Sequence, residues 1–74
     1  MTLEQIEKLT ALQMGRRSVS ADQRFMEDLG AESADIVNII ATVEDKFNIS
    51  FDHKDLAAVG TVRDLFELAA GETQ

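Results

Sequence analysis

SADIVNIIATVEDKF, residues 33–47, is the stretch that decides the fold. Its large apolar residues recur at the spacing of one helix face: Ile36, Ile39, Ile40, Val43 and Phe47. The β-branched residues in this stretch are common in strands, but the apolar positions do not alternate, and the helical phase continues throughout. The stretch therefore predicts an amphipathic helix that begins at Ser33 and is interrupted at Asn48.

A second helix is predicted near the start of the chain, over residues 3–14. Thr2 and Gln5 have the spacing of a capping box, in which each side chain bonds the backbone N–H of the other residue. Apolar residues then recur about once per turn, at Leu3, Ile6, Leu9 and Leu12. Gly15 is expected to end this helix, because glycine readily adopts the left-handed conformation that closes many helices.

The last part of the chain predicts a third long helix and a short helical piece before it. Thr61 is expected to cap the long helix, and Gly71 is expected to stop it. The apolar face of the long helix consists of Val62, Leu65, Phe66 and Ala69. Asp52 is expected to cap the short piece, over residues 53–57.

The polar segment at residues 16–32 predicts a long loop, which Phe25 and Leu29 are expected to pin to the core. No strand pattern is found. The expected fold is therefore all-α: a small four-helix bundle of three main helices and one short helix, with a long loop between helices one and two. The core is expected to include Ile36, Ile39, Ile40, Val43, Phe47, Ile49, Phe51, Val62, Leu65 and Phe66.

Length and charge restrict the class of protein. The 74 residues suit one compact domain over residues 1–74. Seven basic against fourteen acidic residues give a net charge of −7, which disfavours nucleic-acid binding and favours a basic partner. There is no cysteine for a disulfide or thiolate metal site. Neither a membrane span nor a signal peptide is recognisable, so we expect a cytoplasmic protein.

The inventory of reactive side chains does not favour an enzyme. Ser33 lacks a G-x-S-x-G turn, and a hydrolase would need the single histidine, His53, to reach Ser33 across the bundle. Six acidic residues and no basic residue lie between Glu27 and Asp45. They are expected to be solvated, which makes them poor proton donors, and their spacing does not match a calcium loop. We expect no catalytic residue and no metal site.

The run FMEDLGAESAD, residues 25–35, resembles the attachment site of acyl carrier proteins. The family pattern is D-L-G-x-D-S-L ahead of an amphipathic helix, and residues 28–33 follow it most closely. The resemblance extends over nearly the whole chain, including the Thr61-Val62 start of the last helix. It implies a non-catalytic carrier. The resemblance also implies that a separate phosphopantetheinyl transferase attaches 4′-phosphopantetheine from coenzyme A to Ser33, and that this arm holds an acyl group as a thioester.

The resemblance also assigns roles to the neighbours of Ser33. Asp28, Leu29 and Gly30 are expected to shape the site, with Leu29 buried and Gly30 at positive φ. Asp28 and the following residues are expected to contact partner enzymes that have basic patches: Glu32, Ala34, Asp35, Asn38 and Asp45. The chain departs from the usual family residues at five positions, namely Glu32, Ala34, Asn38, Ala41 and Asp52.

Several alternatives remain open at this point. Ser33 could have a plain helix-capping role, in a carrier-like interaction module without a prosthetic arm. A carrier could also be dedicated to aminoacyl cargo, and the sequence does not separate fatty-acid, polyketide or related pathways. Met14 and Met26 are expected to pack in the ordinary way; if the helices shelter an acyl chain, the two residues would instead be adaptable fillers at the edge of that crevice. A monomer is expected.

Overall fold

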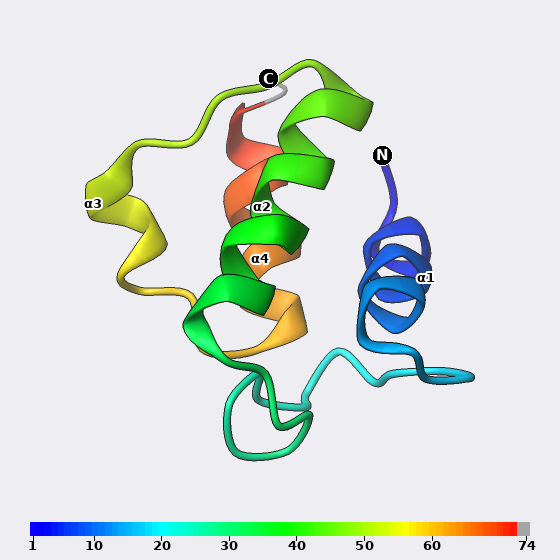
Figure 1. Ribbon diagram of the computed structural model, residues 1–74. Coiled ribbons are helices and arrows are strands. Elements are labelled where there is room, and N and C mark those ends of the chain that lie inside the picture. The colour runs from blue at the N-terminus through cyan, green and yellow to red at the C-terminus, as the bar shows by residue number, and fades with distance from the viewer. Residues whose placement is uncertain (73–74) are drawn as a thin grey trace.

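The computed structural model describes residues 1–72, except for the side chains of residues 53 and 72. Within this part the chain forms four helices: α1 (Leu3–Met14), α2 (Ser33–Phe47), α3 (His53–Leu56) and α4 (Val62–Glu72). In the view of Figure 1, α2 lies in front of α4, with α1 to the right and the short α3 to the left, and α1 contacts both α2 and α4. The radius of gyration is 10.9 Å. The predicted all-α bundle is confirmed.

The ends of α1 and α2 follow from their capping residues. The Gln5 amide N–H donates to Thr2 Oγ1 at 3.2 Å, and the Thr2 N–H donates to Gln5 Oε1 at 2.9 Å. Gly15 ends α1 in the left-handed conformation, with φ +67°. Asn48 ends α2 in the same way, with φ +54°. Both helix ends lie where the sequence predicts them.

The last two helices begin at the predicted capping residues. Asp52 accepts a hydrogen bond from the Lys54 amide at 3.0 Å, and α3 ends at Leu56, one residue short of the expected range. At the start of α4, the Asp64 amide donates to Thr61 Oγ1 at 3.1 Å. The Asp64 carboxylate in turn accepts from the Thr61 amide at 3.0 Å, which completes a reciprocal cap.

Two sequence expectations are wrong. Leu12, expected on the apolar face of α1, is 80% exposed. Each step of three residues falls about 60° short of a full helical turn, so Leu12 has rotated away from Ile6 and Leu9. Thr10 takes the buried position instead. Gly71 does not stop α4, because it lacks the positive φ of a helix-ending glycine and the helix continues to residue 72.

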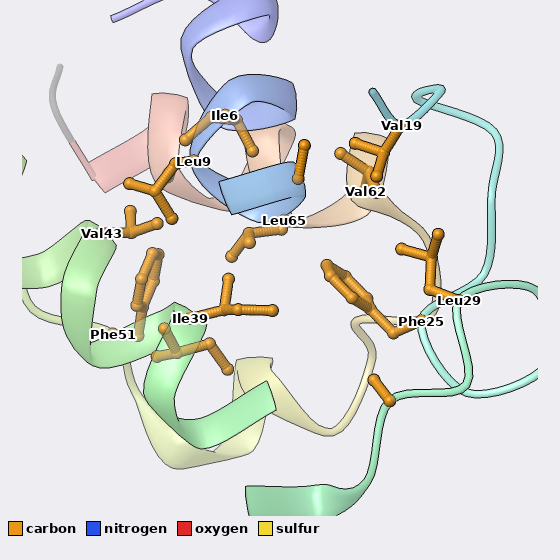
Figure 2. Packing of buried hydrophobic residues seen from close by; sticks show 14 residues of the cluster. Ile6, Leu9, Val19, Phe25, Leu29, Ile39, Val43, Phe51, Val62 and Leu65 are labelled. Atoms are coloured by element: carbon orange, nitrogen blue, oxygen red, sulfur yellow. The ribbon is translucent and has the colours of Figure 1, made fainter. Parts of the chain in front are cut away.

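The core lies where the three long helices meet. Figure 2 shows Ile39 and Val43 of α2 facing Leu65 of α4, with Phe51 closing one end of the cluster and Phe25 entering from the other. Of the predicted core residues, six are buried: Ile39, Ile40, Val43, Phe51, Val62 and Leu65. The other four are half-buried and pack against the cluster: Ile36, Phe47, Ile49 and Phe66.

The long loop is tied to the start of α4 by backbone hydrogen bonds. The Phe25 amide donates to the Gly60 carbonyl at 2.9 Å, and the Val62 amide donates to the Gln23 carbonyl at 3.2 Å. Phe25 and Leu29 are both buried, as expected. The loop is therefore anchored by side chains in the core and by pairing with a segment about forty residues away in sequence, and it holds the residues before α2 in place.

Candidate functional site

Ser33 is the first residue of α2 and is exposed. Its hydroxyl has no hydrogen bond to any side chain or backbone group that the structure describes. The capping position belongs to the preceding residue, Glu32, whose amide donates to Asp35 Oδ2 at 2.9 Å. The capping role considered for Ser33 is therefore wrong. The helix begins without using this hydroxyl, which is left free for another molecule.

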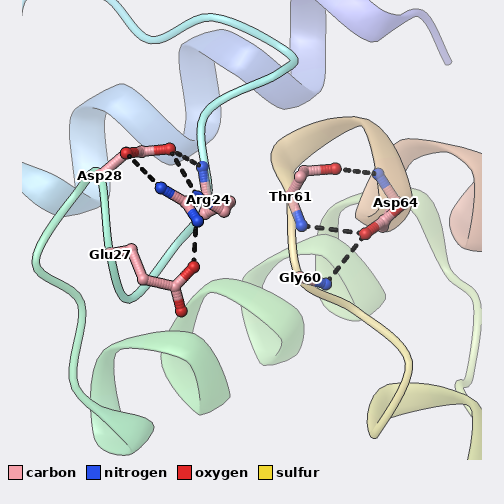
Figure 3. A network of polar contacts seen from close by, with 6 residues as sticks. All are labelled: Arg24, Glu27, Asp28, Gly60, Thr61 and Asp64. Atoms are coloured by element: carbon pink, nitrogen blue, oxygen red, sulfur yellow. Dashed lines mark hydrogen bonds and ion pairs between the residues drawn. The ribbon is translucent and has the colours of Figure 1, made fainter.

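The turn before Ser33 is stabilised by contacts of Arg24 with two carboxylates, those of Asp28 and Glu27. Asp28 Oδ2 accepts hydrogen bonds from the Arg24 amide at 2.8 Å and from Arg24 Nε at 3.1 Å. Arg24 Nε also lies 3.2 Å from Glu27 Oε2, and Figure 3 shows both carboxylates around the same guanidinium. These hydrogen bonds lower the pKa of Asp28 and raise the pKa of Arg24.

The same turn is also stabilised by the backbone conformation of Gly30 and by burial of Leu29. Gly30 has φ +67°, the left-handed conformation expected for it. No atom lies within 4 Å of the position that a Cβ would take at Gly30, so conformation rather than space favours glycine there. Leu29 is buried, and the Ala31 amide donates to the Phe25 carbonyl at 2.8 Å. The conformation of this turn therefore fixes the position of Ser33 at the start of α2.

An apolar groove begins at Ser33. Its volume is about 410 Å³, and it lies between α2 and the segment that joins α3 to α4. Besides Ser33, it is lined by Met26, Ile36, Val37, Ile40, Leu56, Ala57 and Val59. A second groove of about 300 Å³ shares Met26, Ile36 and Val59 with the first. Met26 lines both grooves, whereas Met14 lines neither and packs against the core, which is the ordinary packing expected for it.

The acidic residues near Ser33 differ in what they contact. Asp35 accepts the Glu32 amide, and Glu44 Oε2 accepts the Phe51 amide at 3.0 Å. Glu32 and Asp45 are exposed, as are the uncharged residues Ala34 and Asn38. The expected partner residues therefore surround Ser33 or lie further along α2, but two carboxylates of this helix are engaged with the chain's own backbone.

The sequence interpretation missed two parts of this site. Val37 was not selected, although its position four residues after Ser33 places it on the same side of the helix. The groove wall formed by Leu56, Ala57 and Val59 was also missed. These residues have no motif, and only the folded structure shows that they line one groove together with Ser33 and residues of α2.

A second carboxylate with a lowered pKa lies at the base of α4. Asp64 Oδ2 accepts the Gly60 and Thr61 amides, each at 3.0 Å, and Figure 3 shows this cap beside the Arg24 cluster. The hydrogen bonds from Thr61 and then Gly60 lower the pKa of Asp64. Among the side chains that the structure describes, no group of three or more potential ligands is placed to hold a metal ion.

None of the helices in the described part is long and apolar enough to cross a membrane. The side chain of His53, which the hydrolase alternative requires, lies outside the described part. No described side chain contacts the Ser33 hydroxyl as a general base would. The site therefore presents a free nucleophile that the described residues do not activate.

Comparisons with known proteins agree with this arrangement. Residues 4–69 match the family model described as the phosphopantetheine attachment site. The chain is 42% identical over 65 residues to acyl carrier protein 3 of Ralstonia nicotianae. This matched region covers 85% of this chain and 75% of the relative.

Two solved structures are similar over almost the whole chain. A Mycobacterium tuberculosis protein assigned as an acyl carrier protein has a TM-score of 0.87 at 26% identity, covering 95% of this chain and 97% of that one. A type II acyl carrier protein of Streptomyces verticillus, involved in bleomycin biosynthesis, has a TM-score of 0.83 at 25% identity, covering 97% and 87%. The chain belongs to the acyl carrier protein family, whose phosphopantetheine attachment domain it contains.

Proposed function

We propose that Ser33 carries the 4′-phosphopantetheine arm and that the arm holds an acyl group as a thioester for partner enzymes. The observation that carries this proposal is the free Ser33 hydroxyl at the first position of α2. A side chain that stabilised the helix end would be hydrogen-bonded there, and Glu32 occupies the capping position instead. The hydroxyl is thus accessible to an enzyme that modifies it.

The place of Ser33 also suits a phosphodiester. The N-terminus of a helix carries a partial positive charge, and an anion placed there gains about 0.3–1 kcal/mol when exposed. The turn at Leu29 and Gly30 leaves the hydroxyl on the surface rather than in the core. The bound arm would supply a terminal thiol for the acyl group, while this chain provides its point of attachment.

We propose that another protein performs the chemistry, because no described side chain contacts the Ser33 hydroxyl as a base. A phosphopantetheinyl transferase would remove the hydroxyl proton and break the pyrophosphate bond of coenzyme A. Ser33 Oγ would form a new bond to the phosphate that carries pantetheine, and the nucleotide part of coenzyme A would leave as adenosine 3′,5′-bisphosphate. Acyl-transferring and acyl-modifying enzymes would subsequently act on the loaded arm, and the carrier would perform no turnover of its own.

The apolar groove supports an acyl group as cargo. It starts at Ser33, and its other lining residues are apolar. A hydrocarbon chain on the arm gains about 0.8 kcal/mol for each CH₂ group that it buries, whereas a polar aminoacyl group gains little there. This favours acyl over aminoacyl cargo, in fatty-acid, polyketide or related biosynthesis. We further propose that the carrier is a cytoplasmic, monomeric domain over residues 1–74.

The experiment incubates the purified chain with coenzyme A, Mg²⁺ and a broad-specificity transferase, followed by intact-mass analysis. We expect the wild type and a Ser50→Ala control to gain the mass of one phosphopantetheine group, and Ser33→Ala to gain none. Ser50 is also exposed, which makes it a matched serine away from the site. A wild-type chain that stays bare would support the interaction module without an arm.

A further inference from the structure

A separate groove is lined by side chains of α1 and α2, and we call it the α1–α2 groove. Its volume is about 230 Å³. Its apolar lining comes from α1 and consists of Leu9 and Leu12. Gln13 Nε2 donates to Thr42 Oγ1 at 3.4 Å, so a polar contact joins the two helices at this groove. The groove shares no residue with the one that begins at Ser33.

The α1–α2 groove lies on the face of α2 that is turned away from Ser33. Thr42 and Lys46 line it, nine and thirteen residues after Ser33. At about 100° per residue, these residues are rotated by about 180° and about 220° from Ser33 around the helix axis. At about 1.5 Å per residue, they also lie roughly 14 and 20 Å further along it. A molecule bound in this groove therefore leaves the attachment site uncovered.

Leu12 gives the groove an exposed apolar contact. Its side chain is 80% exposed, compared with 63% for Val37 and 52% for Met26. A single exposed leucine on a convex surface needs no explanation. Leu12, however, lines a concave site together with Leu9, which is only 7% exposed. An apolar side chain that enters the groove can therefore contact both leucines.

The charge at this groove is opposite to the net charge of the chain. The chain has a net charge of −7, yet two of its seven basic residues, Lys8 and Lys46, line the groove. None of the described residues that line it is acidic. Lys46 has no ion-pair partner among the described side chains. Lys8 lies 3.3 Å from Glu4, but both side chains are about three-quarters exposed, and such a pair contributes little.

The shape of the groove suits a helix. Two packed helices leave a furrow between their side chains that can receive the ridge of a third helix. The α1 residues that line the furrow extend from Gln5 to Gln13, which corresponds to roughly 12 Å, or about two helical turns. A flat anionic membrane would not reach Leu9 in the groove, and it would repel a chain of this net charge. The shape and the charge therefore favour a protein segment.

We propose that the α1–α2 groove is the docking site for an acidic amphipathic helix of a partner protein, which remains bound while Ser33 is free to react. The apolar face of the partner helix packs on Leu9 and Leu12, and its carboxylates pair with Lys8 and Lys46. Acidic residues elsewhere on the carrier oppose this contact weakly, because salt screens charges more than about 10 Å apart. The basic partners expected around Ser33 act on the opposite face, so both can bind at once.

The first experiment identifies the partner by photo-cross-linking in cells of the source organism. The photoreactive residue p-benzoylphenylalanine replaces Gln13, which is exposed and lines the groove. Leu12 and both lysines stay intact in this variant. The control carries the same group at Ser50, an exposed position outside the groove. We expect a protein adduct from position 13 that position 50 does not give, and mass spectrometry identifies the captured protein and the cross-linked helix.

The second experiment measures Kd between the carrier and the purified captured protein by calorimetry. Leu12→Gln and Lys46→Glu should each weaken binding at least about tenfold. The matched control is Lys54→Glu, which makes the same charge change at an exposed position of α3 outside the groove and should alter Kd less than about twofold. An increase from about 50 to about 500 mM NaCl should weaken wild-type binding at least about threefold. Thermal melts verify that each variant is folded.

Four outcomes would overturn this inference: no adduct specific to position 13, an adduct with a second copy of this chain, a captured protein whose Kd is unaffected by Leu12→Gln and Lys46→Glu, or binding to phosphatidylglycerol vesicles that Leu12→Gln abolishes. A bound partner that blocks modification of Ser33 would contradict simultaneous binding. None of these results bears on the attachment site. Conversely, a wild type that no transferase modifies overturns the proposed function and leaves the groove proposal standing.

Discussion

Replacement of Phe25 by alanine tests whether the long loop is an integral part of the fold. Phe25 belongs to the loop, yet its side chain is only 1% exposed and points into the core beside Leu29 (Figure 2). Its amide donates to the Gly60 carbonyl, and its carbonyl accepts from the Ala31 amide. One residue thus links the turn before Ser33 to the core and to the start of α4.

The expected loss is large for a domain of this size. Phenylalanine to alanine in a core costs about 3–5 kcal/mol in transfer and cavity free energy. At about 0.05–0.15 kcal/mol per residue, the whole chain has a free energy of unfolding of only about 4–11 kcal/mol. With a shift of about 4–8 °C for each kcal/mol, Tm should fall by at least about 12 °C.

The neighbouring residue provides the control. Met26 is 52% exposed, so Met26→Ala should change the free energy of unfolding by no more than about 0.5 kcal/mol. Both variants and the wild type are measured by urea denaturation with circular dichroism. A loss below about 1 kcal/mol for Phe25→Ala, or equal losses for the two variants, would refute the claim that the loop is anchored through this side chain.

Three further predictions concern the turn, the α4 cap and the net charge. Gly30→Val places a branched side chain at φ +67°, which should cost at least about 1–2 kcal/mol and slow modification of Ser33; an unchanged modification rate would argue against a shaping role for the turn. Asp64 has a folded pKa below its ordinary value of 3.8, so its stabilisation is complete above that pH and is lost as the pH falls through the lowered value. Asp64→Asn should therefore lower the free energy of unfolding by about 1 kcal/mol at neutral pH and show less acid sensitivity, as measured by urea titrations at several pH values; equal acid sensitivity would contradict this account. Because the net charge is −7, moderate salt or divalent cations should raise Tm, and a Tm independent of ionic strength would show that self-repulsion is unimportant.

The helices could be predicted from the sequence because their signals are local. Thr2, Thr61 and Asp52 cap the helices that follow them, and Gly15 and Asn48 end helices in left-handed conformations. Apolar spacing identified residues that are buried in the core or pack against it, but it failed at Leu12. Leu3, Ile6, Leu9 and Leu12 repeat every three residues, whereas a helix has about 3.6 residues per turn. Leu12 therefore lies off the buried face, and Thr10 is buried instead.

The parts that could not be predicted depend on contacts between distant segments. Pairing of the loop with the start of α4 has no strand pattern, because it involves a single isolated bridge, between Arg24 and Thr61. The acidic region was read as solvated, but Glu44 turns to the Phe51 amide seven residues later. A charge count does not show which carboxylates are engaged in this way, and the polarity of the surface beside Ser33 depends on it.

The most direct test of the central claim is peptide mass spectrometry of the chain purified from its own cells. We expect phosphopantetheine on the peptide that contains Ser33, with fragment ions that place it on that serine. A chain that is unmodified, or that carries the group on another residue, would contradict the assignment of Ser33 as the attachment point.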